Sequence, residues 1–341
     1  MRRSAPEFWW RADPTGRALA LWPLARAWGA AATWRMNRAP QFRPPVPVIC
    51  VGNFVVGGAG KTPTAIALAR MARSRGLTPG LLASGYGGRA KGPILVDPAV
   101  YGADHVGDEA LLLAAVAPTV VARDRVAGAR KLIAEGVDAI VMDDGFQNPS
   151  LAKDLSLIVV DSGVGVGNGM SVPSGPMRAP LTPQLQRADA LLMIGDGEGI
   201  DPIVRAAARA GRATLRARLR PVRIKEWRKQ PILAFAGIGR PQKFFATLAE
   251  TGATVARTVG FPDHHPYAEA DATTLLAAAE AGGLRLVTTE KDYARLAGRS
   301  GALAELYERA DPFPVTLTFD NPAAVGAMID EAVRRAALAQ R

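Results

Sequence analysis

The stretch VPVICVGNFVVGGAGKTPTAIALARM, residues 46–71, places a buried strand, a glycine-rich turn and the start of a helix in immediate succession. This order is the layout of a phosphate-binding loop. Glycines let backbone N–H groups turn inward around phosphate oxygens, and the helix N-terminus adds partial positive charge. In that layout Lys61 can reach the β- and γ-phosphates of a nucleotide, and the Thr62 hydroxyl can ligate Mg²⁺. The stretch therefore predicts a nucleotide-binding α/β domain.

The loop departs from the strict pattern G-x-x-x-x-G-K-[ST] at one position. That pattern places glycine six residues before the lysine, where this chain has Val55. An ordinary glycine-rich turn before a helix is the alternative interpretation. A strand, the run GGAGKT and a helix nevertheless occur in the required order, and this favours the phosphate loop.

Length and composition place the chain among globular proteins. Its 341 residues, 48% of them hydrophobic, are enough for two domains with cores of their own. The single cysteine, Cys50, lies inside the first predicted strand, which excludes an internal disulfide and favours a reducing compartment. A net charge of +11 indicates an anionic partner, but charge alone does not distinguish nucleic acid, an anionic membrane and a phosphorylated substrate.

The first 45 residues differ from the rest of the chain in composition. They hold five of the six tryptophans and eight arginines, with only two acidic residues. Aromatic rings beside arginines are typical of segments at a bilayer interface. Because Arg17, Arg26 and Arg35 cut the apolar runs well below the ~20 residues needed to cross a bilayer, residues 1–45 are predicted to lie on a membrane as an amphipathic segment. The alternative is a helix packed on the protein's own core.

From Val46 to about Asp196, apolar strands alternate with helices. An alternation of this kind gives a parallel sheet covered by helices, with ligands bound at the carboxyl ends of the strands. The predicted strands after the loop are residues 81–84, 119–122, 139–142, 155–160 and 190–194.

The strand at residues 139–142 ends in paired carboxylates, Asp143 and Asp144, followed by Gly145. A phosphate-loop enzyme holds its Mg²⁺ at this place. Aspartate and glycine also favour turns, so a plain strand-end turn is the alternative. Two adjacent acids after so apolar a run favour the metal interpretation.

Three further segments carry candidate functional residues. Asp108 opens a predicted helix at residues 110–117, where a helix N-cap is its simplest role. The Gly/Pro-rich loop at residues 167–180 holds one arginine, Arg178, which can meet a phosphate. For His264, an exposed loop position and a hydrogen-bonded catalytic histidine are the competing interpretations.

Residues 205–230 are strongly basic, with eight arginines and two lysines against a single acid, Glu226. A nucleic-acid surface calls for interleaved aromatic residues, and only Trp227 is present, so no nucleic acid is expected as a partner. The stretch is interpreted as a solvated connector between two domains.

A second, smaller α/β unit is predicted to begin near Pro231. Its strands are expected at residues 232–236, 254–259 and 284–288, with helices from Pro241 and Ala268. No obligate protein partner is inferred from the sequence.

Taken together, these motifs resemble the tetraacyldisaccharide 4′-kinase family, the lipid A 4′-kinases, over nearly the whole chain. Their joint order is more specific than any one motif. The motifs are VGNFVVGGAGKTP (51–63), SGYGG (84–88), GDE (107–109), DDGFQ (143–147), GNG followed by SGPMR (167–178), AFAGIGRPQKFF (234–245), DHHPY (263–267) and TTEKD (288–292).

Sequence and resemblance together predict an α/β fold, in which a P-loop kinase-like parallel-sheet domain is joined to a second, smaller α/β domain. The predicted division is an amphipathic membrane-associated segment (1–45), a kinase domain (46–222), a basic linker (223–230) and the smaller domain (231–341). The resemblance implies transfer of the γ-phosphate of ATP, with Mg²⁺, to the 4′-hydroxyl of tetraacyldisaccharide 1-phosphate in lipid A biosynthesis. It also implies a peripheral location at the cytoplasmic face of the bacterial inner membrane, with the lipid A precursor and an anionic membrane surface as partners.

The resemblance also assigns roles residue by residue. Asp108 becomes the catalytic base, paired with His264 of the second domain, so that domain closure assembles the base. The implied metal residues are Thr62, Asp143 and Asp144, of which Asp144 is the Walker-B-like acid with Asp143 beside it. The implied nucleotide-binding residues are Gly57, Gly58, Ala59, Gly60, Lys61, Thr62, Gln147 and Arg178, of which Lys61 also takes part in catalysis.

Ser84, Asn148 and Ala179 depart from the family pattern, where arginine, histidine and glutamate are usual. These departures concern details of metal and phosphate contact, not the class of enzyme. A glutamate at position 179 can reach the metal, so Ala179→Glu is expected to lower the Mg²⁺ concentration needed for activity. The alternative function is a P-loop NTPase that docks on membranes or nucleic acid through its basic surface and uses hydrolysis as a switch.

Overall fold

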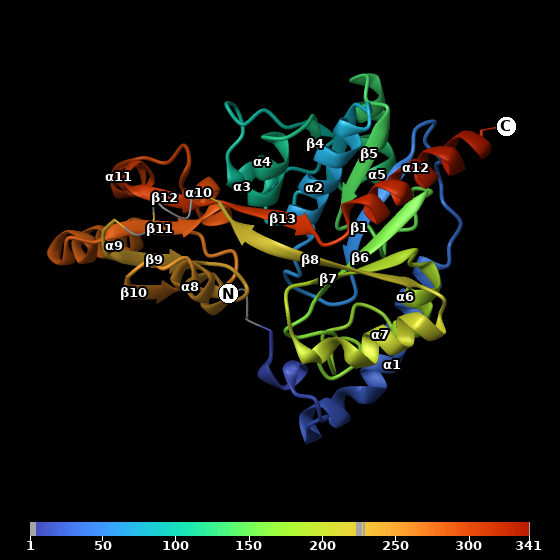
Figure 1. Ribbon diagram of the computed structural model, residues 1–341, viewed down its shortest axis with the longest axis horizontal. Coiled ribbons are helices and arrows are strands. Elements are labelled where there is room, and N and C mark those ends of the chain that lie inside the picture. The colour runs from blue at the N-terminus through green and yellow to red at the C-terminus, as the bar shows by residue number, and fades with distance from the viewer. Residues whose placement is uncertain (1–4, 223–226, 228, 341) are drawn as a thin grey trace.

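The computed structural model describes residues 5–222, 227 and 229–340 of the chain. Over these residues the chain forms two α/β units, which lie side by side in Figure 1. The larger unit is built on a nine-stranded sheet and the smaller on a four-stranded sheet.

The larger sheet has the strand order β13-β8-β7-β6-β1-β5-β2-β4-β3. Its strands from β8 to β4 run parallel, and β13 and β3 pair antiparallel at the two edges. The strands are β1 (Val48–Asn53), β2 (Pro79–Ala83), β3 (Ile94–Leu95), β4 (Thr119–Val121), β5 (Ala139–Asp143), β6 (Leu155–Asp161), β7 (Ala190–Ile194), β8 (Ala213–Pro221) and β13 (Val315–Phe319). The predicted α/β class with its parallel sheet is therefore confirmed.

Helices cover both faces of the larger sheet, so its central strands are buried throughout, including every residue of β1 and β6. One face is covered by α2 (Lys61–Ser74), α4 (Asp108–Ala114) and α12 (Pro322–Leu338). The other face is covered by α1 (Gly16–Met36), α5 (Arg125–Ala134), α6 (Leu181–Arg187) and α7 (Asp201–Arg209). Shorter helical turns in the connections are η1 (Glu7–Trp10), α3 (Ala103–Val106) and η2 (Glu198–Ile200).

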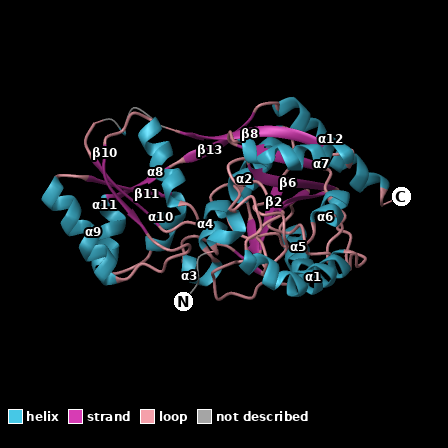
Figure 2. Cartoon of the chain, turned by 90° about the horizontal axis from the view of Figure 1, so that it is seen from below, coloured by secondary structure: helices cyan, strands magenta, loops and turns pink. Residues whose placement is uncertain are grey.

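The smaller sheet has the strand order β10-β9-β11-β12, with all neighbours parallel. Its strands are β9 (Ile232–Ala236), β10 (Val255–Gly260), β11 (Arg285–Thr289) and β12 (Ala310–Phe313), and its helices are α8 (Pro241–Glu250), α9 (Glu269–Gly282), α10 (Glu290–Leu296) and α11 (Gly301–Arg309). Figure 2 shows α9 and α11 at the end of the molecule farthest from α12.

After building the smaller sheet, the chain returns to the larger one. β13 pairs with β8, and α12 packs its buried residues Val325, Ile329 and Ala332 into the core of the larger unit. The predicted division assigned all of residues 231–341 to the smaller domain. In the structure, β13 is a strand of the larger sheet and α12 packs on that sheet. The return leaves little trace in the sequence, because Pro314 alone separates β12 from β13.

The arginine-rich stretch contains regular structure, and its interpretation as a solvated connector is wrong for α7 and β8. In β8, Arg216, Arg218 and Arg220 are exposed and alternate with Leu215, Ala217 and Leu219, which pack on the core of the larger unit. A strand turns successive side chains to opposite faces, so one face is basic and the other is apolar. The predicted linker at residues 223–230 lies largely outside the described residues.

Helix α1 packs on the larger unit mainly through small residues and leaves most of its large apolar residues exposed. Its buried residues are Ala18, Ala25, Gly29, Ala32 and Met36. A Cβ on Gly29 would lie 3.0 Å from Cγ of Pro180, so the helix approaches the protein closely there. Its exposed apolar residues are Leu19, Trp22, Leu24, Trp28 and Trp34, each between 46% and 64% exposed. In the described part of the chain, no helix is both long enough and apolar enough to cross a membrane.

Candidate active site

The loop between β1 and α2 has the backbone of a phosphate-binding loop. Gly57 and Gly60 have φ of 103° and 90°, in the left-handed region that favours glycine. A Cβ on Gly60 would also lie 2.7 Å from Cδ1 of Ile194, so this position has no room for a side chain. Gly60 directly precedes α2, whose first-turn N–H groups are therefore directed back toward the loop. Lys61 Nζ donates to the Gly57 carbonyl at 3.3 Å, so its ammonium lies over the loop.

Val55 occupies the position at which the strict motif has glycine. Its backbone is not left-handed, and the two described non-glycine residues that do have positive φ are Asp144 and His264. The Val55 carbonyl accepts a hydrogen bond from Nε of Arg178 at 3.0 Å. The fold thus does not require glycine here, and the position ties the loop to the segment that carries Arg178.

Thr62 and Asp143 meet where α2 begins and β5 ends. Thr62 Oγ1 donates to Oδ2 of Asp143 at 3.1 Å. The other carboxylate oxygen, Oδ1, is buried and has no hydrogen-bond partner among the described residues. Burial, together with the charge of Glu109, raises the pKa of Asp143 to about 7. A buried carboxylate oxygen without a partner, next to a threonine hydroxyl, is suited to bind a hard cation such as Mg²⁺.

Asp144, the next residue, is in a different electrostatic setting. Arg178 donates to both of its oxygens, at 2.5 and 2.9 Å, and Lys61 Nζ lies 3.7 Å from Oδ2. Burial disfavours the charged form of Asp144, but the charges of Lys61 and Arg178 outweigh it and hold the pKa of this carboxyl well below its usual range. Asp143, not Asp144, is therefore the acid in contact with the Thr62 hydroxyl.

Gln147 fixes the segment after β5. Its Nε2 donates to the Asn53 carbonyl at 2.8 Å and to Oε1 of Gln184 at 2.9 Å, while Arg178 Nη1 donates to its Oε1 at 3.3 Å. Gln184, which the sequence did not single out, is fully buried in α6 and donates to the Ala179 carbonyl at 2.6 Å. Gln147 thus contacts the Arg178 guanidinium, and Gln184 fixes the backbone of the next residue, Ala179.

A groove of about 460 Å³ connects this cluster with the N-terminal segment. Its lining includes Asp144, Gln147 and Arg178 from this cluster and Trp9, Trp28 and Arg35 from the N-terminal segment. Trp28 Nε1 donates to the Arg178 carbonyl at 3.1 Å, and Trp9 Nε1 donates to the Pro173 carbonyl at 3.0 Å. Two tryptophans interpreted from composition as membrane-interface residues thus also form a wall of the site.

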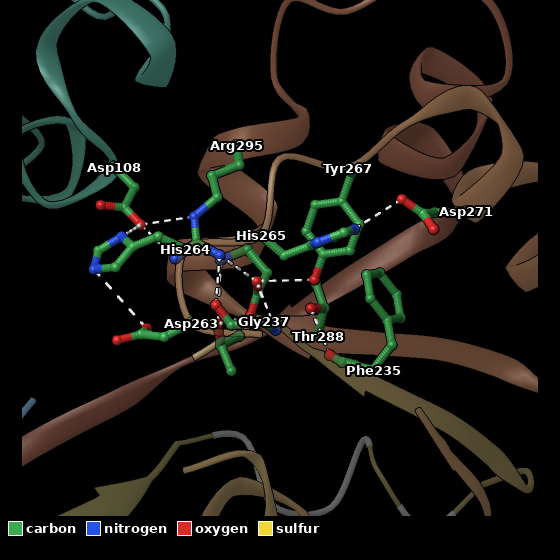
Figure 3. Close-up of polar contacts among 12 residues, drawn as sticks. Asp108, Phe235, Gly237, Asp263, His264, His265, Tyr267, Asp271, Thr288 and Arg295 are labelled. Atoms are coloured by element: carbon green, nitrogen blue, oxygen red, sulfur yellow. Dashed lines mark hydrogen bonds and ion pairs between the residues drawn. The ribbon is translucent and has the colours of Figure 1, made fainter. Parts of the chain in front are cut away.

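A second cluster joins the two units around Asp108, the first residue of α4 (Figure 3). The Asp108 side chain has no exposed surface. Arg295 of α10 donates from Nε to Oδ2 of Asp108 at 2.7 Å, and Nδ1 of His264 lies 3.4 Å from the same oxygen. The structure therefore brings Asp108 and His264 into contact across the two units, and it adds Arg295, which the sequence did not single out.

Residues of the smaller unit hold Arg295 firmly. Its Nη1 donates to Oδ1 of Asp292 at 2.7 Å and to the Gly237 carbonyl at 2.8 Å. The same Asp292 oxygen accepts from the Tyr267 hydroxyl and from the Gly237 N–H, each at 2.9 Å (Figure 3). The guanidinium is thus held in one orientation, with its remaining donors directed at Asp108.

Charge around Asp108 favours its ionised form. Burial opposes ionisation, but the hydrogen bond from His264 and the charges of Arg295 and Lys291 outweigh it and hold the pKa of Asp108 well below its usual range. Lys291 itself donates to Oε1 of Glu109 at 2.6 Å. Two neighbouring acids of α4 thus face two cations of α10, one turn apart.

Glycines bring the Asp108 segment close to the SGYGG motif. Gly107 has φ of 90°, and a Cβ there would lie 2.6 Å from the Tyr86 carbonyl oxygen. The Tyr86 ring packs edge-on against the His264 ring, with centroids 5.2 Å apart. A small hollow lined by Ser84, Gly107, Glu109, Asp143 and Asp144 lies between the start of α4 and the acid pair. Asp108 therefore begins a helix that borders the phosphate-loop site.

Comparison with known proteins identifies the family of the chain. The sequence profile of the family described as "Tetraacyldisaccharide-1-P 4'-kinase" matches residues 17–334 of the chain. The "Tetraacyldisaccharide 4'-kinase" of Rhizobium meliloti (strain 1021) is 50% identical over 337 residues, which cover 98% of this chain and 97% of that protein. The protein of the same name from Xanthobacter autotrophicus (strain ATCC BAA-1158 / Py2) is 52% identical over 337 residues, covering 97% of this chain and 98% of that protein.

A solved structure shares the fold of both units. LpxK from Aquifex aeolicus, crystallised in complex with ATP, superposes with a TM-score of 0.73 and 23% sequence identity. The superposition covers 93% of this chain and 99% of that one.

Proposed function

The chain belongs to the tetraacyldisaccharide-1-P 4′-kinase family, and from this membership we propose how its residues carry out the reaction. The protein is an ATP-dependent kinase that transfers the γ-phosphate to the 4′-hydroxyl of a tetraacyldisaccharide 1-phosphate, a step of lipid A biosynthesis. The observation that supports the location of the site is the meeting of Lys61, Thr62 and Asp143 at the glycine loop.

ATP is the substrate that the loop suits. The first-turn amides of α2 and the glycine backbone would surround the β- and γ-phosphates, and Lys61 would exchange its bond to the Gly57 carbonyl for a phosphate oxygen. Arg178 would share its charge between Asp144 and the phosphates. Gln147 keeps Arg178 oriented for that contact.

Thr62 and Asp143 fit the Mg²⁺ that such a reaction uses, because the Asp143 Oδ1 atom is buried without a partner beside the threonine hydroxyl. Bound there, the ion would offset negative charge on the β- and γ-phosphates. Asp144, already neutralised by Arg178 and Lys61, would contribute mainly by keeping those two cations in place.

The acceptor fits the groove between the acid cluster and the tryptophans. Its 4′-hydroxyl oxygen forms the new bond to the γ-phosphorus as the bond to the ADP oxygen breaks, and the hydroxyl proton passes to Asp108. Trp9, Trp28 and Arg35 would contact the sugars and the lipid-proximal end of the acceptor. The acyl chains would then leave the groove along α1.

Helix α1 supports docking on the cytoplasmic face of an anionic inner membrane. Its exposed leucines and tryptophans offer apolar contact, and the arginines among them complement anionic headgroups. ATP is supplied from the cytosol, so the groove and the phosphate loop must open to that side.

The decisive experiment measures ATP turnover by the purified protein with and without a purified tetraacyldisaccharide 1-phosphate acceptor. A kinase produces one ADP for each phosphorylated lipid and little ADP without acceptor. ATP hydrolysis at the same rate in both conditions, with no labelled phosphate on the lipid, would establish the switch-type NTPase instead. Lys61→Ala, tested in parallel, controls for contaminating ATPases.

A further inference from the structure

Arg295 is a buried cation shared between one acid of each unit. Its side chain is 9% exposed, and the side chains of its two carboxylate partners, Asp108 of α4 and Asp292 of α10, have no exposed surface. All three of its nitrogens donate hydrogen bonds, from Nε and Nη2 to Asp108 and from Nη1 to Asp292 and Gly237. A buried guanidinium that uses four of its five N–H donors in this way fixes the geometry of its partners more than it stabilises the fold.

The two oxygens of Asp108 have different surroundings. Oδ2 accepts both bonds from Arg295 and faces His264 (Figure 3). Oδ1 accepts one hydrogen bond, from the Glu109 N–H at 2.9 Å. Each carboxylate oxygen has two lone pairs, so Oδ1 keeps one for a further donor. The acceptor hydroxyl can donate its hydrogen bond to this free lone pair of Oδ1, whereas Oδ2 anchors the carboxylate.

We propose that Arg295 is a positioning residue of the kinase reaction, which anchors Oδ2 of Asp108 and leaves its Oδ1 available to the acceptor hydroxyl. Because Arg295 and its supports belong to the smaller unit, contact between the units and preparation of Asp108 are a single event. This inference rests on the proposed role of Asp108 as the group that accepts the hydroxyl proton.

The other charged groups around Asp108 cannot replace Arg295. Lys291 of the same helix is already bound to Glu109 at 2.6 Å, and His264 lies at 3.4 Å. Glu109 adds negative charge on Asp108's own helix, and Asp292 adds it behind Arg295. Without Arg295 the influences that remain are burial and two nearby acids on one side, and the hydrogen bond from His264 and a lysine that is already paired on the other. The pKa of Asp108 must then rise, because burial disfavours the charged form.

Arg295 also controls access to Asp108. The Asp108 side chain has no exposed surface while Arg295 is bound to it, so we infer that the acceptor enters when the smaller unit moves away and meets Oδ1 when the unit returns. Arg295 leaves and re-engages Asp108 with that movement. Its loss should therefore lower kcat more than it raises the KM for ATP, because the phosphate loop itself lies in the larger unit.

The test compares Arg295→Gln, Arg295→Lys and, as a matched control, Arg299→Gln. Arg299 is an exposed arginine after α10 that donates to the Arg295 backbone carbonyl at 3.4 Å and takes no part in the bonds between Arg295 and Asp108. The readout is kcat/KM for the acceptor, expressed as the ratio of variant to wild type between pH 8 and pH 5.5. Taking this ratio cancels every titration that the proteins share. Nucleotide binding and thermal unfolding are measured on the same samples.

Arg295→Gln should be about 10- to 100-fold less active at pH 8, the range for a lost hydrogen bond to a charged group. Its deficit should grow as pH falls, by up to about tenfold per pH unit below the raised pKa of Asp108, because protonated Asp108 cannot accept the proton. Arg295→Lys keeps the positive charge but cannot donate from two nitrogens to Asp108 as the guanidinium does. It should therefore lose activity by a factor that does not depend on pH. Arg299→Gln should stay within about twofold of wild type, as expected for an exposed site.

A deficit of Arg295→Gln that is the same at every pH would overturn the inference, as would activity equal to wild type. If Arg295→Gln does not fold, Arg295→Lys decides: the inference requires a folded, nucleotide-binding protein with lowered kcat. Asp108→Asn separates this inference from the proposed function. Full acceptor-dependent turnover by Asp108→Asn would refute the role of Asp108 itself. An inactive Asp108→Asn together with a pH-independent Arg295→Gln deficit would refute only the role of Arg295.

Discussion

Arg178 donates to both carboxylate oxygens of Asp144, at 2.5 and 2.9 Å, and so neutralises one member of an adjacent acid pair. Asp143, the other member, contacts the Thr62 hydroxyl and leaves one buried oxygen without a partner. Neighbouring aspartates of one motif therefore have different chemical capacities. One is compensated by cations of the protein, and the other is open to a cation from outside.

Separate substitution of the two acids tests this difference. Asp143→Asn should raise the Mg²⁺ concentration for half-maximal activity by about tenfold or more, because it removes a negatively charged oxygen ligand. Asp144→Asn should lower the rate by loosening Arg178 and Lys61 while changing the Mg²⁺ requirement much less. Initial rates across a Mg²⁺ titration at saturating ATP measure both effects. Equal shifts in the two variants would show that the acids share the metal.

Lys61→Ala and Thr62→Ala should each lower turnover by about three orders of magnitude, the loss expected when a principal phosphate or metal contact is removed. Both side chains contact the loop and the acids, not the apolar core, so the variants should remain folded. Thermal unfolding and acceptor phosphorylation are measured on the same preparations. Near-normal activity of folded Lys61→Ala protein would contradict the kinase site described above.

Asp108→Ala and His264→Ala should lower turnover, and the double variant should be little worse than the more damaging single one, because the two residues act as a unit. His265→Ala is the matched control: its ring pairs with Asp271 at 2.8 Å, not with Asp108. Steady-state rates are measured for the wild type and for these four variants. Losses that multiply in the double variant would mean that Asp108 and His264 act independently.

Helix α1 should have two separable tasks. Trp28→Phe removes the donor to the Arg178 carbonyl and should raise the KM for the acceptor several-fold with little change in vesicle binding. Trp22→Ala, on an exposed residue without a site contact, should weaken binding to anionic vesicles while kcat on detergent-solubilised acceptor stays near wild type. Co-sedimentation with vesicles and acceptor titrations measure the two properties. Identical profiles for both variants would show that α1 has a single function.

The sequence predicted the elements whose signal is local. The phosphate loop, the buried strands β1, β2, β4, β5, β6 and β7 and the acid pair after β5 all follow from short apolar runs, glycines and charges that are adjacent in the chain. The return of β13 and α12 to the larger sheet was missed, because strand pairing between β13 and β8 depends on contacts far apart in sequence.

The same limit applies to the site. Arg295 lies 187 residues from Asp108, and Trp28 lies 150 residues from Arg178, so no local spacing relates either pair. The motif TTEKD identified the right segment, but not the residue one turn beyond Lys291 that contacts Asp108. In β8 the arginines dominated the composition and hid a period-two alternation with Leu215, Ala217 and Leu219.

The last prediction concerns Ala179, for which the structure changes the expectation drawn from the resemblance. A glutamate at this position was expected from the resemblance to reach the metal, but the Ala179 side chain is fully buried within the apolar core between the larger sheet and α1. A glutamate there would have to displace packed side chains and to ionise without water. Ala179→Glu should therefore lower the free energy of unfolding by about 3 kcal/mol or more, and Ala179→Gln by somewhat less because it adds no charge.

Mg²⁺ distinguishes the two expectations for this position. If the new carboxylate ligates the ion, adding Mg²⁺ and nucleotide should restore the melting temperature of Ala179→Glu but not of Ala179→Gln, because binding to the native state stabilises it. We expect no such difference, since the neighbouring Gln184 holds the Ala179 carbonyl at 2.6 Å and keeps this segment against the core. Equal Mg²⁺-induced shifts in both variants would place the metal out of reach of residue 179.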